Sequence, residues 1–413
     1  MAVIDARKWL PAFLNHLGLT GEGVEVGVSR GDNADNVLSG LPDHSPPVPA
    51  WRGRTLHLVD VDLRAARVRF AAGRPGRAEV TFRERPSAVA AAEFADESLD
   101  WVYVDADHRY EAVKADVAAW WPKVRPGGLL GGHCYMITDW GGHEFCGVRW
   151  AVDRFAADRG LPVYVAPSDP EPSWFVFKCP PARAGEVVVV SGHTDPAKHF
   201  VAAVRRNHEG YCARWGYEYR FIDLPRPADR SPVWEKLPAV VRVMGDAPPG
   251  KKWVVWVDAD AVFTNPARPI HTYAVDRFAF LAAGWYGGNP RLAGQGWHPD
   301  CGVMFFRRCA NVAERLTRTY AEADAVRWDP PHDDHGLREA FATETGPDAL
   351  LYVTREFNAC PQWSPARGGL DGREFVMHFS YGVGDDRKAA AILDTLSAVA
   401  DGAVLPPPAR GPS

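Results

Sequence analysis

Two apolar segments of this chain end in the same acidic tripeptide, and these acids are well placed to do chemistry. The first segment, 101–107, ends in Asp105-Ala-Asp107, and the second, 253–260, ends in Asp258-Ala-Asp260. A strand that delivers carboxylates to its C-terminal end places them at the edge where open α/β sheets bind ligands. Such acids can hold a divalent cation or orient a polar substrate. Because the flanking residues differ, we predict two sites of different chemistry.

The residues around the first acidic strand alternate between strand and helix patterns. The expected strands are 24–28, 55–61, 99–104 and one that begins at 129, and the expected helices are 33–38, 88–94 and 110–121. A closing hairpin is expected within 162–178. Strands separated by helices predict a parallel, doubly wound α/β sheet.

A Pro/Gly-rich segment at 179–185 marks the boundary to a second α/β domain. We predict domains at 1–180 and 186–400 and a disordered tail at 401–413. Beyond the boundary, the expected strands are 187–190, 217–222, 253–257 and 303–306, and the expected helices are 196–209, 234–245 and 312–323. The Gly-, Trp- and Asn-rich stretch 284–302 is expected to form loops around a pocket.

Composition excludes several classes of function. The 413 residues carry a formal net charge of −5 without a long Lys/Arg run, which argues against nucleic-acid binding. No stretch approaches the roughly 20 apolar residues of a membrane span, and the N-terminus lacks the pattern of a signal peptide. The seven cysteines include no CxxC pair, which indicates reduced thiols in a cytoplasmic protein. A homo-oligomer is compatible with the sequence.

The first domain carries the pattern of a cofactor site. Glu25-Val-Gly27-Val-Ser29-Arg-Gly31 joins a strand to a helix, where glycines allow the backbone to approach a ligand closely. The next strand ends in Asp60, whose carboxylate can accept hydrogen bonds from both hydroxyls of a ribose.

Together with Asp105–Glu111 and Arg125–Tyr135, these residues resemble class I S-adenosylmethionine-dependent methyltransferases, in particular the small-molecule O-methyltransferase branch. The resemblance covers roughly 1–178. It implies that Asp105 and His133 face the acceptor hydroxyl, as general base or as metal ligands. Cys134 stands where metal-dependent relatives often carry a second carboxylate, which argues against a metal in this domain. The cofactor-binding residues implied by the resemblance are Glu25, Gly27, Ser29, Gly31 and Asp60.

Other interpretations of the first domain stay open. Gly27-x-Ser29-x-Gly31 also fits the nucleophile elbow of α/β-hydrolases, although that elbow should follow several earlier strands. A dinucleotide-binding oxidoreductase would need a different spacing of the third glycine. Asp105 and Asp107 could also cap strand ends in a domain without activity. We interpret His108 and His143 as surface or structural residues.

The second acidic strand has the features of a nucleotide-sugar site. Asp258 and Asp260 lie between a buried strand and a further apolar turn, after an upstream β-α-β unit that begins at Val187. Two carboxylates one residue apart can grip a divalent ion that neutralises a departing diphosphate. Lys236 lies upstream and is available for a phosphate.

The order of motifs resembles metal-dependent glycosyltransferases of the GT-A fold, in particular the retaining galactosyl- and xylosyltransferases that include galactomannan and xyloglucan enzymes. The resemblance covers roughly 186–395. It implies that Asp258, Asp260 and His378 bind the metal, that Ser191 and Lys236 bind the nucleotide donor, and that Asp334 lies near the transferred sugar or acceptor. The motifs that carry it are 231–239, 256–263, 299–306, 332–335 and 375–382.

At two motifs this chain differs from those relatives, and both differences concern the identity of the donor sugar. They typically show Asn-Thr-Gly where this chain has Asp300-Cys301-Gly302, and Asp-Asp-Gln where it has Asp333-Asp334-His335. The resemblance implies that both positions read sugar identity, so the donor sugar is not carried over from those relatives. Trp285, Tyr286, Trp297 and Trp363 could stack on a carbohydrate or belong to the core.

Less specific interpretations of the second domain also stay open. The Asp258/Asp260 pair could cap a loop, and His378 could be a packed histidine. His332-Asp-Asp-His335 could be a separate metal site, or its acids could simply favour a helix start.

The sequence as a whole predicts a bifunctional tailoring enzyme. One domain would transfer a sugar from a nucleotide sugar with Mn²⁺ or Mg²⁺, and we expect a UDP-sugar donor and retention at the anomeric carbon. The other would use S-adenosylmethionine to O-methylate the sugar or its acceptor, which could be a small molecule, a peptide or a glycan. The alternatives are that only one domain is catalytic and the other presents substrate, or that the protein binds carbohydrate without chemistry.

Overall fold

The structure is a computed structural model of the full chain, and the chain divides into two compact units. The first unit contains residues up to Pro180, together with a later stretch that includes residues 350–352, and the second contains the remainder. The described residues are 7–44, 47–71, 78–136, 138–139, 145–166, 171–276, 278–286, 297–322, 336–337, 340–341, 350–353, 376–379 and 385–400.

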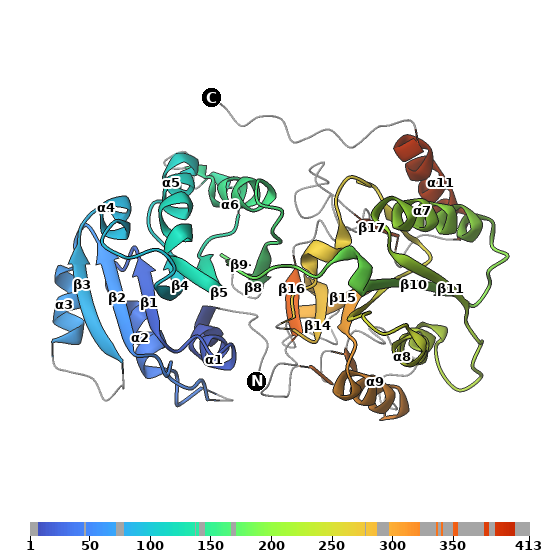
Figure 1. The fold of residues 1–413 in the computed structure, drawn as a ribbon, viewed down its shortest axis with the longest axis horizontal. Coiled ribbons are helices and arrows are strands. Elements are labelled where there is room, and N and C mark those ends of the chain that lie inside the picture. The colour runs from blue at the N-terminus through green and yellow to red at the C-terminus, as the bar shows by residue number, and fades with distance from the viewer. Residues whose placement is uncertain are drawn as a thin grey trace. The chain divides into compact units, whose positions relative to one another are not determined.

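The first unit is built on a mostly parallel sheet in the order β8-β9-β5-β4-β1-β2-β3 (Figure 1). β1, β2, β3, β4 and β5 run parallel, and β9 is antiparallel to both β5 and β8. The strands are β1 (Glu22–Val26), β2 (Thr55–Asp60), β3 (Glu79–Glu84), β4 (Leu99–Val104), β5 (Val124–Gly132), β8 (Tyr164–Ala166) and β9 (Ser173–Phe177), with a small hairpin of β6 (Thr138–Asp139) and β7 (Phe145–Cys146).

Helices cover both faces of this sheet (Figure 1). α4, α5 and α6 lie on one face, and α1, α2 and α3 lie on the other. The central strand β4 is buried along its whole length, as a strand covered on both faces must be. The helices are α1 (Leu10–His16), α2 (Asp32–Ser39), α3 (Arg64–Phe70), α4 (Ser87–Ala91), α5 (Tyr110–Trp120) and α6 (Val148–Ala157), with 3₁₀ turns at Arg7–Trp9 and Trp121–Lys123.

The second unit has a mixed sheet in the order β11-β10-β12-β15-β14. β10 pairs in parallel with β11 and β12, and β15 runs antiparallel to β12 and β14. A separate two-stranded sheet pairs β13 with β17. The strands are β10 (Val187–His193), β11 (Glu218–Asp223), β12 (Trp253–Val257), β13 (Ala261–Phe263), β14 (Phe280–Tyr286), β15 (Trp297–Arg307) and β17 (Val376–His378). β16 (Leu350–Val353) belongs, apart from its last residue, to the first unit.

Two pairs of helices flank the second sheet. α7 packs with α11 on one side, and α8 packs with α9 on the other (Figure 1). The α7–α11 side encloses a cluster of apolar residues that includes Val204, Val262 and Phe379, which joins these helices to the β13–β17 sheet. The helices are α7 (His199–Trp215), α8 (Lys236–Asp246), α9 (Ala310–Glu322) and α11 (Asp385–Ala400), with 3₁₀ turns at Ala184–Glu186, Pro232–Glu235 and Ile270–Tyr273.

The predicted elements occur in the structure, several with shifted ends. The strands 99–104 and 253–257 have the predicted bounds, whereas the strand expected at 303–306 is the longer β15. Part of the stretch expected as loops, 284–302, belongs to β14 and β15. The sequence patterns did not indicate the edge strand β3 or the helices α1, α3, α6 and α11. The tail predicted at 401–413 lies outside the described residues.

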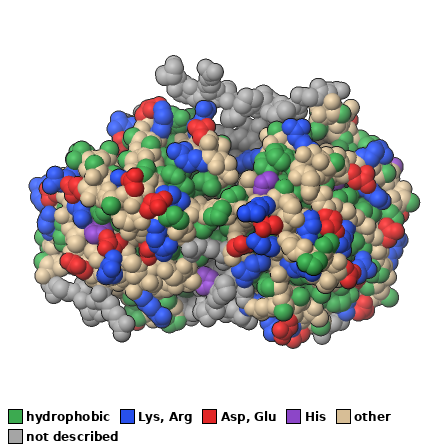
Figure 2. All heavy atoms as spheres, viewed as in Figure 1, with side chains coloured by type: hydrophobic (Ala, Val, Ile, Leu, Met, Phe, Trp, Pro, Cys, Tyr) green, Lys and Arg blue, Asp and Glu red, His purple; other side chains and the backbone are tan. Residues whose placement is uncertain are grey.

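The surface carries charges of both signs. Figure 2 shows Lys and Arg side chains interspersed with Asp and Glu over the visible face. Across the described part of the chain, no helix is both long enough and apolar enough to cross a bilayer.

Candidate functional sites

The first candidate site lies where β1, β4 and β5 end side by side. Backbone hydrogen bonds continue past the strands: Asp105 N donates to Val26 O at 2.7 Å, and His133 N donates to Val104 O at 3.0 Å. Each residue that follows its strand is therefore fixed by a neighbouring strand. Chain connections leave β1 and β4 in opposite directions along the sheet, which makes this the switch point where doubly wound folds bind ligands.

The glycine-containing loop after β1 approaches the end of β4 closely. Gly27 has φ +84°, and a Cβ there would lie 2.2 Å from the carbonyl oxygen of Asp105. Gly31 has φ +79° and immediately precedes α2. Both positions favour glycine, because L-residues rarely adopt this backbone conformation and Gly27 has no room for a side chain.

Asp60 organises this loop from the end of β2. One carboxylate oxygen, Oδ2, accepts hydrogen bonds from Val28 N at 2.8 Å and Ser29 N at 2.9 Å. The other oxygen, Oδ1, accepts one from Asp62 N at 3.2 Å. The structure thus brings the predicted ribose acid to the predicted glycine loop, and it shows a loop-anchoring role that the sequence did not indicate.

Glu25 is a buried acid inside β1. It is 2% exposed, and its Oε2 atom has no hydrogen-bond partner in the structure. Both polar side-chain atoms of the nearby Asn33 are in the same condition. Burial, reinforced by the negative charge of Asp105, raises the pKa of Glu25 to about 8. Buried polar atoms without a hydrogen-bond partner destabilise the folded state. A polar group of a ligand could form hydrogen bonds with them here.

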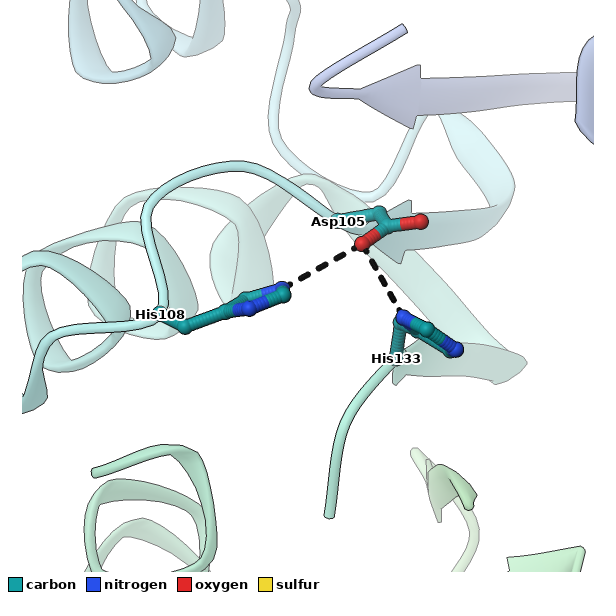
Figure 3. Close-up of side chains that lie close together, drawn as sticks. All are labelled: Asp105, His108 and His133. Carbon is teal, nitrogen blue, oxygen red and sulfur yellow. Dashed lines mark hydrogen bonds and ion pairs between the residues drawn. The ribbon is translucent and has the colours of Figure 1, made fainter. Parts of the chain in front are cut away.

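Asp105 is the centre of a compact cluster with two histidines (Figure 3). Its Oδ1 atom lies 3.3 Å from His108 Nε2 and 3.3 Å from His133 Nδ1. Its Oδ2 atom accepts a hydrogen bond from Arg7 Nη1 at 2.8 Å. Ligand atoms of Asp105, His108 and His133 lie close enough together to hold a metal ion.

The charge of Asp105 is strongly stabilised. Burial by itself would raise its pKa, but hydrogen bonds from His108 and His133 and the charge of Arg7 outweigh burial and hold the pKa well below its usual range. A carboxylate in this state is a weak proton acceptor. Asp105 is therefore better suited to orient a histidine than to take a proton itself.

Two members of this cluster were not identified from the sequence. His108, interpreted there as a surface or structural residue, is half-buried and contacts Asp105. The only sequence signal was its position three residues after Asp105. Arg7 is separated from Asp105 by 98 residues, and no local pattern indicates that contact. His143 lies outside the described residues.

The second candidate site forms where β12 ends. His378 Nε2 lies 3.4 Å from Asp258 Oδ2 and 3.4 Å from Asp260 Oδ1. The ligand atoms of these three residues lie within 4.8 Å of one another. The structure therefore brings together the three residues predicted to bind a metal, from positions 118 and 120 residues apart along the chain.

Strand pairing explains how this distant histidine reaches the acids. β13 pairs with β17 so that Ala261 faces His378, and Phe379 N donates to Asp260 O at 3.1 Å. On the other side, Asp258 N donates to Gly302 O in β15 at 2.8 Å. The acids are thus held between two antiparallel partners.

Positive groups of the chain surround the two acids. Lys236 Nζ, at the start of α8, lies 3.2 Å from Asp258 Oδ1, and Lys388 of α11 pairs with Asp260 Oδ2. Trp256 Nε1 also donates to Asp258 Oδ1 at 2.5 Å. Lys236, predicted to bind the nucleotide donor, lies beside Asp258, whereas Lys388 was not identified, because the sequence patterns did not indicate α11.

Opposite charges control protonation in this site. Burial alone would raise the pKa of both acids, but Lys236 acting on Asp258 and His378 acting on Asp260 lower them. Burial would lower the pKa of His378, but its three carboxylate neighbours raise it well above the usual value. A metal at His378 must therefore displace a proton, as is general for histidine ligands.

Several predicted residues are not part of either described cluster. Ser191 lies inside β10 and is fully buried. Asp334 and the rest of His332–His335 lie outside the described residues, as does Trp363. Trp285, Tyr286 and Trp297 lie in β14 and β15.

Both units match known protein families in sequence. Residues 24–135 match a family described as a methyltransferase domain, and residues 186–278 match the galactosyl transferase GMA12/MNN10 family. These matches confirm the two resemblances inferred from the motifs. Residues 24–135 are thus similar to methyltransferase domains, and residues 186–278 are similar to glycosyltransferases of family 34. The predicted α/β fold class is likewise confirmed, with a mostly parallel sheet in the first unit and a mixed sheet in the second, each flanked by helices.

Individual relatives are similar to only part of the chain. "Probable glycosyltransferase 6" of Oryza sativa subsp. indica is 32% identical over 133 residues, which are 30% of this chain and 26% of that protein. Galactomannan galactosyltransferase 1 of Cyamopsis tetragonoloba is 25% identical over 185 residues, 42% of this chain and 41% of that protein. The chain thus spans less than half the length of these curated relatives.

One solved structure is also similar to part of the chain. The glycosyltransferase involved in glycosylation of the major capsid of PBCV-1 has a TM-score of 0.40 and 14% sequence identity, covering 50% of this chain and 98% of that one.

Proposed function

We propose that this protein transfers a sugar from a nucleotide sugar in its second unit and methylates an oxygen in its first. The observation that carries the proposal is that one chain contains two candidate binding sites of different chemistry. One is the Asp258/Asp260/His378 cluster in a glycosyltransferase domain, and the other is the glycine loop beside Asp105 in a methyltransferase domain.

The first unit fits S-adenosylmethionine. Gly27 leaves room for close backbone approach, Glu25 and Asn33 have unsatisfied buried atoms, and Asp60 lies at the end of the adjacent strand. When bound, the cofactor supplies an electrophilic methyl group. In this proposal Glu25, Gly27, Ser29 and Gly31 contact its methionine end, and Asp60 contacts its ribose.

The acceptor hydroxyl must lose its proton as the methyl group arrives, and His133 is proposed to take that proton. His133 is 8% exposed, and its Nδ1 lies next to Asp105. Donation of Nδ1–H to this carboxylate leaves Nε2 as the basic nitrogen, and Asp105 stabilises the imidazolium that forms. Asp105 thus acts by orienting His133. Enclosure of the acceptor beside the methyl donor would supply much of the rate through orientation.

The second unit fits a divalent cation. Two carboxylate oxygens and one imidazole nitrogen suit Mn²⁺, and oxygen ligands also suit Mg²⁺. When bound, such an ion would offset the negative charge that develops on a departing diphosphate. Asp258, Asp260 and His378 would hold it, while Lys236 and Lys388 would add positive charge beside the leaving group. Asp334 is proposed near the transferred sugar.

Fusion of the two domains suggests a shared product. The sugar transferred by one unit, or the acceptor that carries it, would be methylated by the other, with a small molecule, peptide or glycan as acceptor. A UDP-sugar donor, retention at the anomeric carbon and a cytoplasmic location belong to this proposal and rest on the sequence resemblance and composition.

A crossed pair of substitutions tests the proposal. Asp258→Asn should abolish Mn²⁺-stimulated release of UDP from UDP-sugars while leaving binding of S-adenosylhomocysteine, measured by calorimetry, unchanged. Asp60→Ala should weaken that binding by about tenfold or more and leave UDP release intact. Asp394→Asn, an exposed change on α11, serves as the control for both.

The outcomes separate the alternatives. If wild-type protein releases no UDP from any nucleotide sugar but binds S-adenosylhomocysteine, the second unit presents substrate to an active methyltransferase. If wild-type protein neither releases UDP nor binds S-adenosylhomocysteine, both site assignments fail. If Asp258→Asn and Asp60→Ala both retain UDP release and S-adenosylhomocysteine binding, the sites lie elsewhere in the chain.

A further inference from the structure

Asp300 makes a contact that its position in the sequence did not suggest. The sequence placed it where related enzymes read the donor sugar. In the structure, its Oδ1 atom lies 3.3 Å from His378 Nδ1 and accepts a hydrogen bond from Gly302 N at 3.2 Å. The opposite ring nitrogen, Nε2, is the one that faces Asp258 and Asp260. The imidazole of His378 therefore lies between Asp300 on one side and Asp258 and Asp260 on the other.

The strands on both sides leave little freedom for this ring. A Cβ on Gly302 would lie 2.2 Å from His378 Nδ1, so β15 offers space for the ring only because residue 302 is glycine. The pairing of β14 with β15 shifts register between Ala282 and Ala283, which pair with Met304 and Asp300. Such an irregularity can re-aim side chains, and Asp300, which lies at this shift, is the residue that contacts the ring.

The chemistry of imidazole gives this contact a consequence. A neutral histidine carries its proton on one ring nitrogen and a lone pair on the other, and the hydrogen bond made by one nitrogen decides which form is present. A carboxylate that accepts Nδ1–H leaves the lone pair on Nε2. Metal-binding histidines commonly have such an outer partner, which also orients the ring.

We infer that Asp300 is a positioning residue for cation binding, because its carboxylate holds the Nδ1–H form of His378 and aims Nε2 between Asp258 and Asp260. The inference rests on the proposed cation site of the second unit. It assigns Asp300 a role through His378, in place of the contact with the donor sugar that the sequence resemblance implies.

Mn²⁺ binding to the full-length protein, measured without nucleotide by the loss of the free-ion electron paramagnetic resonance signal, tests the inference. Asp300→Leu removes the acceptor and should weaken Mn²⁺ binding about 10–100-fold, the usual cost of losing an outer partner of a metal ligand. Asp300→Asn retains a carbonyl acceptor and should restore most of the affinity. Asp394→Asn should bind as wild type does.

A double-substitution cycle distinguishes positioning from a direct or general electrostatic effect. If Asp300 acts through His378, Asp300→Leu should weaken Mn²⁺ binding in the wild-type background and have no further effect in the His378→Ala background. Equal weakening in both backgrounds would overturn the inference, as would an Asp300→Leu protein that binds Mn²⁺ normally but has a changed KM for the nucleotide sugar. Circular dichroism and thermal unfolding establish that each variant is folded, and Asp300→Ala, which also removes the acceptor, replaces the leucine variant in the cycle if that variant does not fold.

The inference and the proposed function fail in different ways. Wild-type protein that binds no Mn²⁺ would remove the cation site and the role of Asp300 with it. Wild-type protein that binds Mn²⁺, together with an Asp300→Leu protein that binds it equally well, would leave the cation site intact and remove only the role of Asp300.

Discussion

The same tripeptide ends a buried strand in each unit, yet the two copies direct their acids differently. In the second unit, Asp258 and Asp260 both lie beside His378. In the first unit, only Asp105 lies beside the histidines. Asp107 instead accepts hydrogen bonds from Arg109 N at 2.9 Å and from the Arg109 guanidinium, and its side chain is 37% exposed.

The element that follows each tripeptide explains the difference. After β4 the chain turns into α5, and Asp107 stabilises that turn by accepting the backbone N–H of Arg109. Short acidic side chains commonly do this before a helix. After β12 the chain continues into β13, whose pairing with β17 holds the second acid beside His378. The DxD pattern therefore places both acids beside a histidine only in the second unit, where the following segment pairs with the strand that carries that histidine.

The largest effect that this comparison predicts is at Asp260. Asp260→Asn should lower metal-dependent sugar transfer at least about 10³-fold, because it removes one of the two anionic ligands that the proposed cation would need. The measurement is initial rates of UDP release across a Mn²⁺ titration. A variant that keeps its rate at saturating Mn²⁺ would show that Asp258 and His378 suffice.

A slightly smaller loss is expected in the first unit at Asp105. Asp105→Asn should lower methyl transfer about 10²–10³-fold, because the amide stabilises the His133 imidazolium poorly. Binding of S-adenosylhomocysteine should change less than about threefold, since Asp105 does not belong to the proposed cofactor contacts. Unchanged methyl transfer with an added chelator would argue that no metal takes part at this cluster.

The buried acid of the first unit should give stability a dependence on pH. Because the pKa of Glu25 rises from 4.5 to about 8 on folding, the unfolded chain loses this proton at lower pH than the folded chain does. The free energy of unfolding should therefore fall as pH rises through that window. Glu25→Gln removes this contribution, so its stability relative to wild type should increase by about 3–5 kcal/mol between pH 4.5 and 8.

Denaturant unfolding of both proteins at several pH values measures this difference. Parallel pH profiles for wild type and Glu25→Gln would show that Glu25 ionises normally in the folded protein.

The smallest effect is expected at Asp107, the counterpart of Asp260. Asp107→Asn should change methyl transfer less than about threefold and lower stability by about 1 kcal/mol or less, because an exposed ion pair with Arg109 contributes little. A large loss of methyl transfer would show that the second acid of each tripeptide enters its site, and the contrast between the two units would disappear.

Much of each site could be predicted because its signals are local. Asp60 ends a strand, and the glycine loop and Asp105 directly follow strands, all with clear apolar patterns, so the parallel sheet order places them together. His378 was predicted only through a family resemblance, since nothing local connects it to Asp258. Arg7 and Lys388 were not predicted as members of the sites, because their contacts depend on how separate elements pack. His108 lies only three residues from Asp105, and its contact depends on the conformation of the loop that joins them.

The sequence by itself determined where the chain could build sites: at the ends of two apolar strands that carry acids, one after a glycine-containing loop and one after a β-α-β unit. Spacing of apolar residues and turn residues encodes such local features. Only the tertiary structure decided which acids work together, because that depends on strand register and helix packing between segments far apart in the chain. It paired β13 with β17 beside His378 and placed Asp300 against the far side of that ring, whereas Asp107 is held by its near neighbour Arg109.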